Sequence, residues 1–245
     1  MLMRRFSILL SLGLGLAASA AAALPRDALW LVVRSCVMAQ RTIGTPFPCL
    51  KVQLPSGDVP GHAVLRAPGS ATHVIVTPTV HVPGIEAREL LRDSAGAYWR
   101  AALDSRRFVI EGAGGRVRLD AVGLALNSAE TRSQDQLHIH AECFRPDVMA
   151  SLRAHPPSPG SGWHPVRGTI DRERYLVRGV THEELGSANL FGLLATVPGA
   201  GGDLSRSKVL LVEASDHLLL AVTRSSQRSI ESLLDDGCTA TARAG

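Results

Sequence analysis

The chain has 245 residues, of which 45% are hydrophobic and 20% are charged, enough for one good-sized domain with a hydrophobic core. The net charge is only +4, and Lys51 and Lys208 are the only lysines among 26 basic side chains. Codon bias in a GC-rich genome is one explanation for so many arginines. A phosphate-bearing partner is the other, because one guanidinium group can donate two parallel hydrogen bonds to a phosphate. Nucleic acid is not expected as the partner, since no dense basic run occurs and aromatic residues make up only 4%.

The first 24 residues have the features of an export segment. Arg4 and Arg5 precede a continuous apolar stretch at 6–24, and Ala18-Ser19-Ala20 has the small-residue spacing of a cleavage site. About 19 residues at about 1.5 Å rise would span roughly 28 Å, just sufficient for a bilayer if the segment is retained. We expect residues 1–24 to be a signal or anchor segment. Residues 25–245 then form one domain outside the cytoplasm, either anchored at a bacterial inner membrane or soluble in the periplasm after cleavage.

The four cysteines form an even set, which in an oxidising compartment predicts two disulfides. We expect Cys36 to pair with Cys49 and close a short proline-containing loop. Cys143 would then pair with Cys238 and tie a central strand to a C-terminal helix. Free buried thiols are the alternative.

The apolar periodicity predicts helices and strands that follow one another along the chain. Helices are expected at 30–33, at 86–108, from Pro146 to 152, at 188–197 behind a capping box formed by Thr181 and Glu184, and at 227–234. Strands are expected at 72–77, 119–127, 136–143, 175–180, 209–212 and 217–222, with 119–127 and 136–143 forming one hairpin and the last two another. Hairpins with interspersed helices, without regular βαβ alternation, predict a single α+β domain built on an antiparallel sheet.

The segment Ser133-Gln134-Asp135-Gln136-Leu137-His138-Ile139-His140-Ala141-Glu142-Cys143 is the richest in chemistry. Side chains alternate along a strand, so Gln136, His138, His140 and Glu142 would share one face, and the apolar residues between them the other. An exposed face with incidental histidines is one interpretation. A metal site is a second, because two neighbouring imidazoles can chelate. The third interpretation, nucleophilic catalysis at phosphorus, is favoured. A purely structural strand would rarely place two imidazoles and a carboxylate in line, because buried polar groups cost free energy unless they have hydrogen-bond partners.

The segment resembles the histidine-triad (HIT) superfamily, whose signature is a strand of alternating histidine and apolar residues, and within it the CDP-diacylglycerol pyrophosphatase family. The matching pieces are Ala125-Leu126-Asn127-Ser128, Arg132-Ser133-Gln134, Leu137-His138-Ile139-His140, and Cys143 with Arg145-Pro146-Asp147-Val148. The resemblance spans nearly the whole chain, from Cys36 to Cys238. It implies a HIT-like antiparallel β-sheet with flanking helices in a single domain.

The resemblance also implies an activity, which is hydrolysis of the pyrophosphate bond of CDP-diacylglycerol to CMP and phosphatidate at a membrane surface. It implies no cofactor and no metal. His138 would be the nucleophile that forms a covalent nucleotidyl intermediate, and His140 would donate hydrogen bonds to the phosphoryl oxygens. Gln136 stands where the triad normally begins with histidine, and its amide forms hydrogen bonds but cannot titrate.

Three further residues are candidates for binding the substrate. Asn127 and Ser133 match polar positions that precede the triad and would hold a phosphate or the departing oxygen. Arg145 would supply positive charge near the pyrophosphate, unless it is structural.

Three other functions stay open on the sequence. A HIT-type hydrolase or nucleotidyl transferase acting on soluble nucleotides would share the nucleophile. A metal-binding envelope protein would use His138, His140 and Glu142. A non-catalytic nucleotide- or lipid-binding module would follow if Gln136 had abolished turnover.

Overall fold

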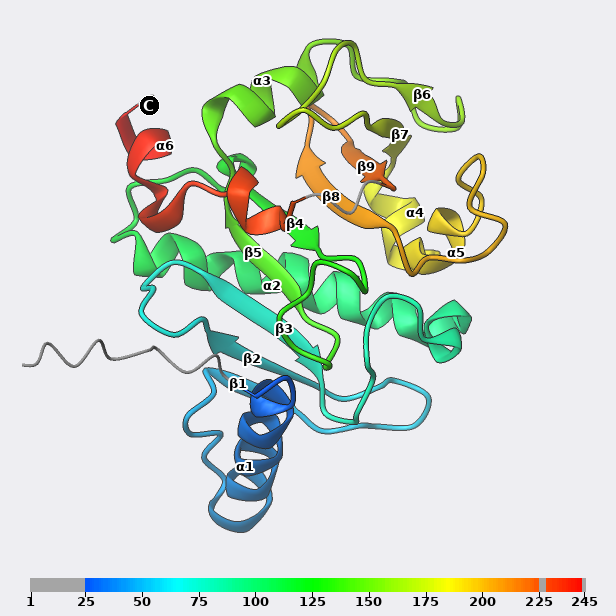
Figure 1. The fold of residues 1–245 in the computed structure, drawn as a ribbon. Coiled ribbons are helices and arrows are strands. Elements are labelled where there is room, and N and C mark those ends of the chain that lie inside the picture. The colour runs from blue at the N-terminus through cyan, green and yellow to red at the C-terminus, as the bar shows by residue number, and fades with distance from the viewer. Residues whose placement is uncertain (1–24, 225–227, 244–245) are drawn as a thin grey trace, which may run out of the picture.

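Nine strands form one sheet in the computed structural model, which describes residues 25–224 and 228–243 (Figure 1). The strand order is β1-β2-β3-β5-β4-β8-β9-β7-β6, and every pairing between these strands is antiparallel. Helices lie on both faces of the sheet. The expectation of a single α+β domain on an antiparallel sheet is therefore confirmed.

The strands and helices have the following bounds. The strands are β1 Lys51–Gln53, β2 His62–Arg66, β3 Val74–Pro78, β4 Val122–Leu126, β5 Ile139–Cys143, β6 His164–Pro165, β7 Leu176–Val180, β8 Lys208–Glu213 and β9 Leu218–Thr223. The α-helices are α1 Ala28–Ile43, α2 Gly96–Gly112, α3 Pro146–Arg153, α4 His182–Ser187, α5 Leu190–Leu194 and α6 Thr239–Arg243. The 3-10 turns are η1 Arg88–Leu91, η2 Asp93–Ala95, η3 Leu119–Ala121, η4 Ile230–Leu233 and η5 Asp236–Cys238.

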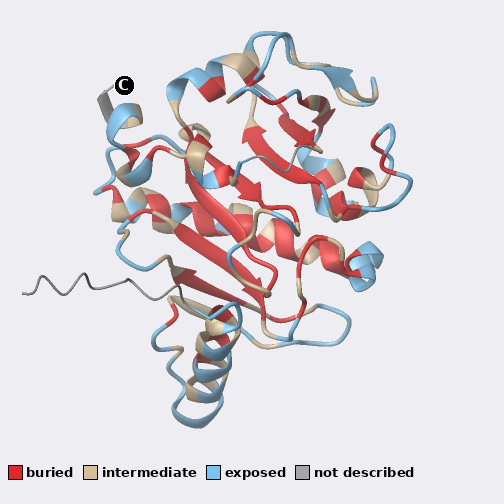
Figure 2. Cartoon of the chain, viewed as in Figure 1, coloured by how far each residue is buried: buried red, intermediate tan, exposed pale blue. Residues whose placement is uncertain are grey.

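The two faces of the sheet carry different apolar clusters. On one face α2, α4 and α5 pack against the strands, and Trp99 of α2 contacts Phe191 of α5. On the other face, α1 packs on β2 and β3, whereas α3 and η4 pack on β4 and β7–β9. Figure 2 shows the buried strands between these layers and the exposed outer side of α1. β5 lies between β3 and β4, so it separates the two clusters of this second face.

Several of the expected elements are confirmed. β4 and β5 pair with each other, as do β8 and β9, so both hairpins form. α3 begins at Pro146, whose missing N–H costs nothing in a first helical turn. Thr181 caps α4, because its hydroxyl accepts a hydrogen bond from the N–H of Glu184 at 2.9 Å.

The expected helix at 86–108 is wrong at its beginning. Arg92 has extended backbone (ψ 144°) and separates η1 from η2, so the α-helix begins only at Gly96. A Cβ atom at Gly96 would lie 2.9 Å from the carbonyl oxygen of Ala188, so the glycine lets that neighbouring segment approach. Tertiary packing therefore decides where this helix begins.

Other boundaries also differ from those expected. The helix at 188–197 is only α5, which begins after the Asn189 cap, and the helix at 227–234 is only the 3-10 turn η4, with Gln227 outside the described residues. The strand expected from 119 begins at Val122, and the ladder of β5 begins at Ile139. The strands β1, β2 and β6 were not expected, and β1 and β6, with three and two residues, are too short to carry a periodicity.

Both expected disulfides are present, and no free cysteine remains. Cys36 of α1 is bonded to Cys49 over a separation of 13 residues, and Cys143 at the end of β5 is bonded to Cys238 over 95 residues. Cys238 lies in the 3-10 turn η5 and not in a helix of the expected kind.

No helix within residues 25–224 and 228–243 is both long enough and apolar enough to cross a bilayer. The expected signal or anchor segment, residues 1–24, lies outside the described residues.

Candidate active site

The site is built on β5 and the residues that lead into it. His140 pairs with Ile75 of β3 on one side and with Ala125 of β4 on the other. Ile75 belongs to the apolar cluster under α1, and Ala125 belongs to the cluster under α3. The imidazole therefore lies on the sheet between two apolar clusters. His138 is on the same side, with its ring centroid 4.8 Å from that of His140.

His138 is held in one orientation by the main chain. Its Nδ1 lies 2.6 Å from the carbonyl oxygen of Gln136. Because a carbonyl only accepts, Nδ1 carries the proton, and the lone pair is left on Nε2. Burial lowers the pKa of His138 below its ordinary value of 6.5, although the hydrogen bond to Gln136 opposes this effect. The ring is therefore neutral at neutral pH.

His140 joins a third histidine. Its Nδ1 lies 2.7 Å from Nε2 of His73, which directly precedes β3. Its Nε2 has no hydrogen-bond partner, and the nearest carboxylate oxygen, of Glu231 in η4, is 3.6 Å away. Burial lowers the pKa of His140 well below 6.5, and the neighbouring His138 and His73 lower it further. The structure thus brings His73, His138 and His140 into one row of neutral imidazoles.

Gln136 holds the loop that follows β3. Its Nε2 donates to the hydroxyl of Thr77 and to the carbonyl oxygens of Pro78 and Val80, at 3.0–3.1 Å, and its Oε1 accepts from the N–H of Val82 at 3.2 Å. The side chain is completely buried. The amide donors are used within the protein, and the contact of Gln136 with His138 is made by its main-chain carbonyl oxygen.

Glu142 lies further along the same strand, and its carboxylate is occupied by local contacts. It accepts hydrogen bonds from the hydroxyl of Thr72 at 2.7 Å and from the N–H of Cys143 at 2.8 Å. Burial raises the pKa of Glu142 to about 7 in spite of these two hydrogen bonds. Neither a salt bridge to arginine nor a contact with His138 is seen for this carboxylate among the described residues.

The three expected substrate-binding residues lie in different surroundings. Asn127 accepts from the N–H of Ile230 and donates to the carboxylate of Glu231, so it positions η4 beside His140. Ser133 is exposed on the loop before His138. Arg145 is bonded to Asp147 and to the carbonyl oxygen of Ser232 beyond the far end of β5, which favours the structural interpretation of this arginine.

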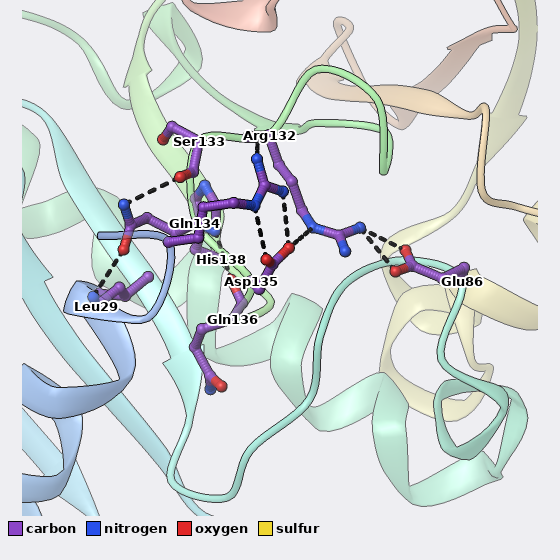
Figure 3. A network of polar contacts seen from close by, with 9 residues as sticks. Leu29, Glu86, Arg132, Ser133, Gln134, Asp135, Gln136 and His138 are labelled. Carbon is purple, nitrogen blue, oxygen red and sulfur yellow. Dashed lines mark hydrogen bonds and ion pairs between the residues drawn. The ribbon is translucent and has the colours of Figure 1, made fainter. Parts of the chain in front are cut away.

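A polar network fixes the loop that carries Ser133 (Figure 3). Arg132 is bonded to Asp135 at 3.0 Å and to Glu86 at 2.7 Å. Asp135 also binds Arg26, at 2.6 Å, and the hydrogen bond from Arg26 lowers the pKa of this carboxyl.

Helix α1 is attached to the same loop. The side-chain oxygen of Gln134 accepts a hydrogen bond from the N–H of Leu29 at 2.8 Å, as Figure 3 also shows. The beginning of α1 is therefore bonded directly to the residues that lead to His138.

A cavity of about 330 Å³ lies at the His73 end of the row. It is lined by the loop 67–70, by His73 and Leu234, and by the carboxylates of Glu142, Glu231 and Asp236. A larger hollow of about 680 Å³ lies around Arg118 and Arg153 and includes no residue of the row.

Metal ligation was one interpretation of the strand face that carries His138, His140 and Glu142. Among the described residues, one group of potential ligands meets the distance requirement for a metal ion, namely Glu142 with Cys143 and Cys238. Both of its sulfurs are in a disulfide, so these atoms are not thiolate ligands. His138 and His140 do not belong to this group.

Sequence reasoning missed His73 and Glu231. His73 reaches His140 because antiparallel pairing of β3 with β5 places the two residues diagonally across the ladder. Glu231 reaches it because Asn127 holds η4. Only the strand register could have indicated the first of these contacts, and no local sequence motif marks the second.

Comparison with known proteins identifies the relatives of this chain. The sequence matches the CDP-diacylglycerol pyrophosphatase family over residues 24–242. It is 34% identical to a CDP-diacylglycerol pyrophosphatase of Yersinia pestis over 220 residues, which cover 86% of this chain and 84% of that protein. The structure of yeast Ap4A phosphorylase Apa2 in complex with Ap4A aligns at 13% identity and a TM-score of 0.38, over 66% of this chain and 56% of its own.

The match to the family model and the 34% identical relative define the chain as a hydrolase. The chain belongs to the CDP-diacylglycerol pyrophosphatase family.

Proposed function

We propose that the protein hydrolyses the pyrophosphate bond of CDP-diacylglycerol and releases CMP and phosphatidate. Nε2 of His138 attacks the phosphorus of the CMP moiety. A P–N bond forms, the P–O bond to the bridging oxygen breaks, and phosphatidate leaves. Water then attacks the same phosphorus and loses a proton, the P–N bond breaks, and CMP is released. Two easier displacements replace one difficult one.

The hydrogen bond between His138 Nδ1 and the carbonyl oxygen of Gln136 carries this proposal. It places the proton on the nitrogen that does not react and leaves a lone pair on Nε2. Burial supports the same state, because it lowers the pKa of His138 and keeps the ring neutral at the pH of the reaction. A neutral imidazole is the nucleophilic form.

His140 would stabilise the charge that develops on the non-bridging phosphoryl oxygens. Its Nε2 has no hydrogen-bond partner, so with a proton there it would donate to a non-bridging phosphoryl oxygen. His73, bonded to the other nitrogen of His140, would fix the tautomer. The phosphates would lie toward His138 and away from Asp236, whose negative charge repels them.

The lipid part of the substrate would keep the protein at a membrane. We propose that the domain acts outside the cytoplasm at the surface of the bacterial inner membrane, held there by residues 1–24 or, after cleavage, by direct contact with lipid. The even set of cysteines, all of them in disulfides, supports an oxidising compartment.

Intact mass spectrometry of protein quenched during turnover tests the chemistry. We expect a nucleotidyl adduct that peptide mapping places on His138. His138→Ala should form no adduct and lose turnover, His140→Ala should form it slowly, and His164→Ala, a change of an exposed histidine of β6, should behave like the parent protein. An adduct in His138→Ala, or unchanged turnover by that variant, would contradict the mechanism.

The same preparation separates the alternatives. CMP release should be faster from CDP-diacylglycerol than from soluble CDP-alcohols, and a strong preference for the soluble compounds would overturn the lipid assignment. Activity should survive a chelator. Loss of activity that zinc restores would instead favour the metal-dependent interpretation.

A further inference from the structure

The outer side of α1 and the loop that follows it carry an apolar surface. Of the eight large apolar side chains that are most exposed among the described residues, four lie here: Leu31 at 53%, Met38 at 64%, Ile43 at 72% and Phe47 at 76%. These four side chains line one shallow hollow. We call them the α1 surface. Exposed apolar side chains scattered singly need no explanation, but a contiguous group indicates an interaction site.

The fold builds this surface from two segments. Leu31 and Met38 are seven residues apart, so they lie on one side of the helix, opposite Leu29, Val33 and Cys36, which pack against the sheet. The Cys36–Cys49 disulfide holds the following loop, and with it Phe47, beside the helix. Figure 1 shows α1 projecting from the rest of the molecule.

The charges at this surface are positive. Arg34 and Arg41 lie on the same exposed side, and α1 contains no acidic residue. A twofold contact between two copies would bring the same patch together and place these arginines against one another without a neutralising carboxylate. Anionic lipid headgroups would instead complement them.

The position of α1 in the chain indicates the same partner. The helix begins at Ala28, separated by three residues from the apolar stretch 6–24, and its first turn is bonded to the loop that leads to His138. We propose that the α1 surface docks the domain on an anionic phospholipid bilayer, with the apolar side chains below the headgroups and the two arginines among them. For the lipid nature of the substrate this inference rests on the proposed function, but docking itself is measured without turnover.

A nitroxide label tests docking in the full chain. Because all four native cysteines are in disulfides, Met38→Cys provides a single reactive thiol, and Leu119→Cys, an exposed residue away from α1, provides the matched control. On adding vesicles of phosphatidylcholine and phosphatidylglycerol, we expect the label at 38 to become roughly tenfold less accessible to a water-soluble nickel chelate and more accessible to oxygen. The label at 119 should not change.

Three results would overturn the proposal. The label at 38 could stay as accessible to the nickel chelate as the label at 119. It could be shielded before vesicles are added, which would show that residues 1–24 cover the surface. Spin–spin broadening between labels at 38 without vesicles would show that a second copy covers it.

Arg34→Glu with Arg41→Glu should weaken docking on anionic vesicles, and no effect would contradict the role of the charges.

A kinetic comparison then connects docking with turnover. The variant with Leu31→Ser, Met38→Ser and Phe47→Ser should hydrolyse CDP-diacylglycerol in vesicles roughly tenfold more slowly and a monomeric short-chain analogue at the parent rate. The control with Val59→Ser, Leu91→Ser and Leu119→Ser should match the parent protein on both substrates. Equal rates for the two variants on vesicles would overturn the inference. If no form of the protein hydrolyses either substrate, the proposed function is wrong. The accessibility of the nitroxide at position 38 would still show whether the α1 surface binds the bilayer.

Discussion

Gln136 contacts two parts of the candidate site, one through its side chain and one through its main chain. Its side chain holds the loop 78–82, whereas its main-chain carbonyl oxygen holds the ring of His138. One residue thus links the end of β3 to the proposed nucleophile. A histidine at this position would offer only two ring nitrogens to the partners that the amide now serves.

We therefore expect Gln136→Ala to lower the free energy of unfolding by about 1–3 kcal/mol, because the carbonyl oxygen of Pro78 and the N–H of Val82 would be left buried without a partner. Turnover should fall as well, because the loop 78–82 beside His138 loses the amide that holds it, although the main-chain carbonyl at 136 remains. The turnover of Gln136→His should lie between those of Gln136→Ala and the parent protein. Urea unfolding and the rate of CMP release measure both effects. Gln53→Ala, which changes an exposed glutamine of β1, is the control. Parent-like stability in Gln136→Ala would contradict the positioning role.

Glu142 makes stability depend on pH. Its pKa is about 7 in the folded protein and 4.5 ordinarily, so between these values the folded state holds a proton that the unfolded state has lost. The stabilising contribution is complete below pH 4.5 and is lost as the pH rises through 7. The difference corresponds to about 3 kcal/mol.

Glu142→Gln removes this titration and can keep hydrogen bonds to Thr72 and to the N–H of Cys143. We expect the variant to match the parent protein at pH 4 and to exceed its free energy of unfolding by up to about 3 kcal/mol at pH 8. Denaturant unfolding at several pH values measures this difference. Glu111→Gln, at an exposed helical position, should show no such trend. A Glu142→Gln advantage that is independent of pH would show that Glu142 does not titrate as described.

At the level of elements, the two disulfides constrain very different lengths of chain. The Cys143–Cys238 bond spans 95 residues and fixes η5 against the end of β5, whereas the Cys36–Cys49 bond spans 13 residues within one corner. In the chain-entropy model, closing the longer loop stabilises the folded state by about 4.5 kcal/mol and closing the shorter one by about 3 kcal/mol.

Replacing both cysteines of one pair by alanine tests this difference. We expect the Cys143→Ala and Cys238→Ala protein to be the less stable of the two double variants in urea and to lose turnover, because Cys143 ends β5, the strand that carries His140. The Cys36→Ala and Cys49→Ala protein should keep its turnover of a monomeric substrate. The reverse order of stability would contradict the account.

Elements with strong local signals were predicted from the sequence. Pro146 marks the beginning of α3, Thr181 caps α4, and the β-branched and leucine-rich runs become β8 and β9. The beginning of α2 could not be predicted, because it depends on the packing of Gly96 against Ala188, a contact between segments far apart in the sequence.

The same limit applies to the candidate site. His138 and His140 are two residues apart, so their shared face follows from strand geometry alone. His73 is bonded to His140 across 67 residues, and Glu231 comes still later in the chain. The spacing of residues does not report such contacts, because they are set by which strands become neighbours and in what register.

At the scale of the whole molecule, the candidate site lies where two separate apolar clusters meet on one face of the sheet. The cluster under α1 and the cluster under α3 both end at β5, and the imidazoles occupy the strip between them. Polar groups are thereby enclosed by rigid packing on each side, which holds the rings in fixed positions. This arrangement suits a reaction that requires a nucleophile and a hydrogen-bond donor at a set separation.

The strand order has a consequence for how the chain matures. Strands β1 to β5 use residues up to Cys143 and form one half of the sheet, while the other half and the partner of Cys143 come later. During synthesis from the N-terminus, the bond between Cys36 and Cys49 can close early, but the thiol of Cys143 has its partner only after the next 95 residues have emerged. Oxidative maturation therefore has a defined order, and the late step is the one that completes the surroundings of the histidines.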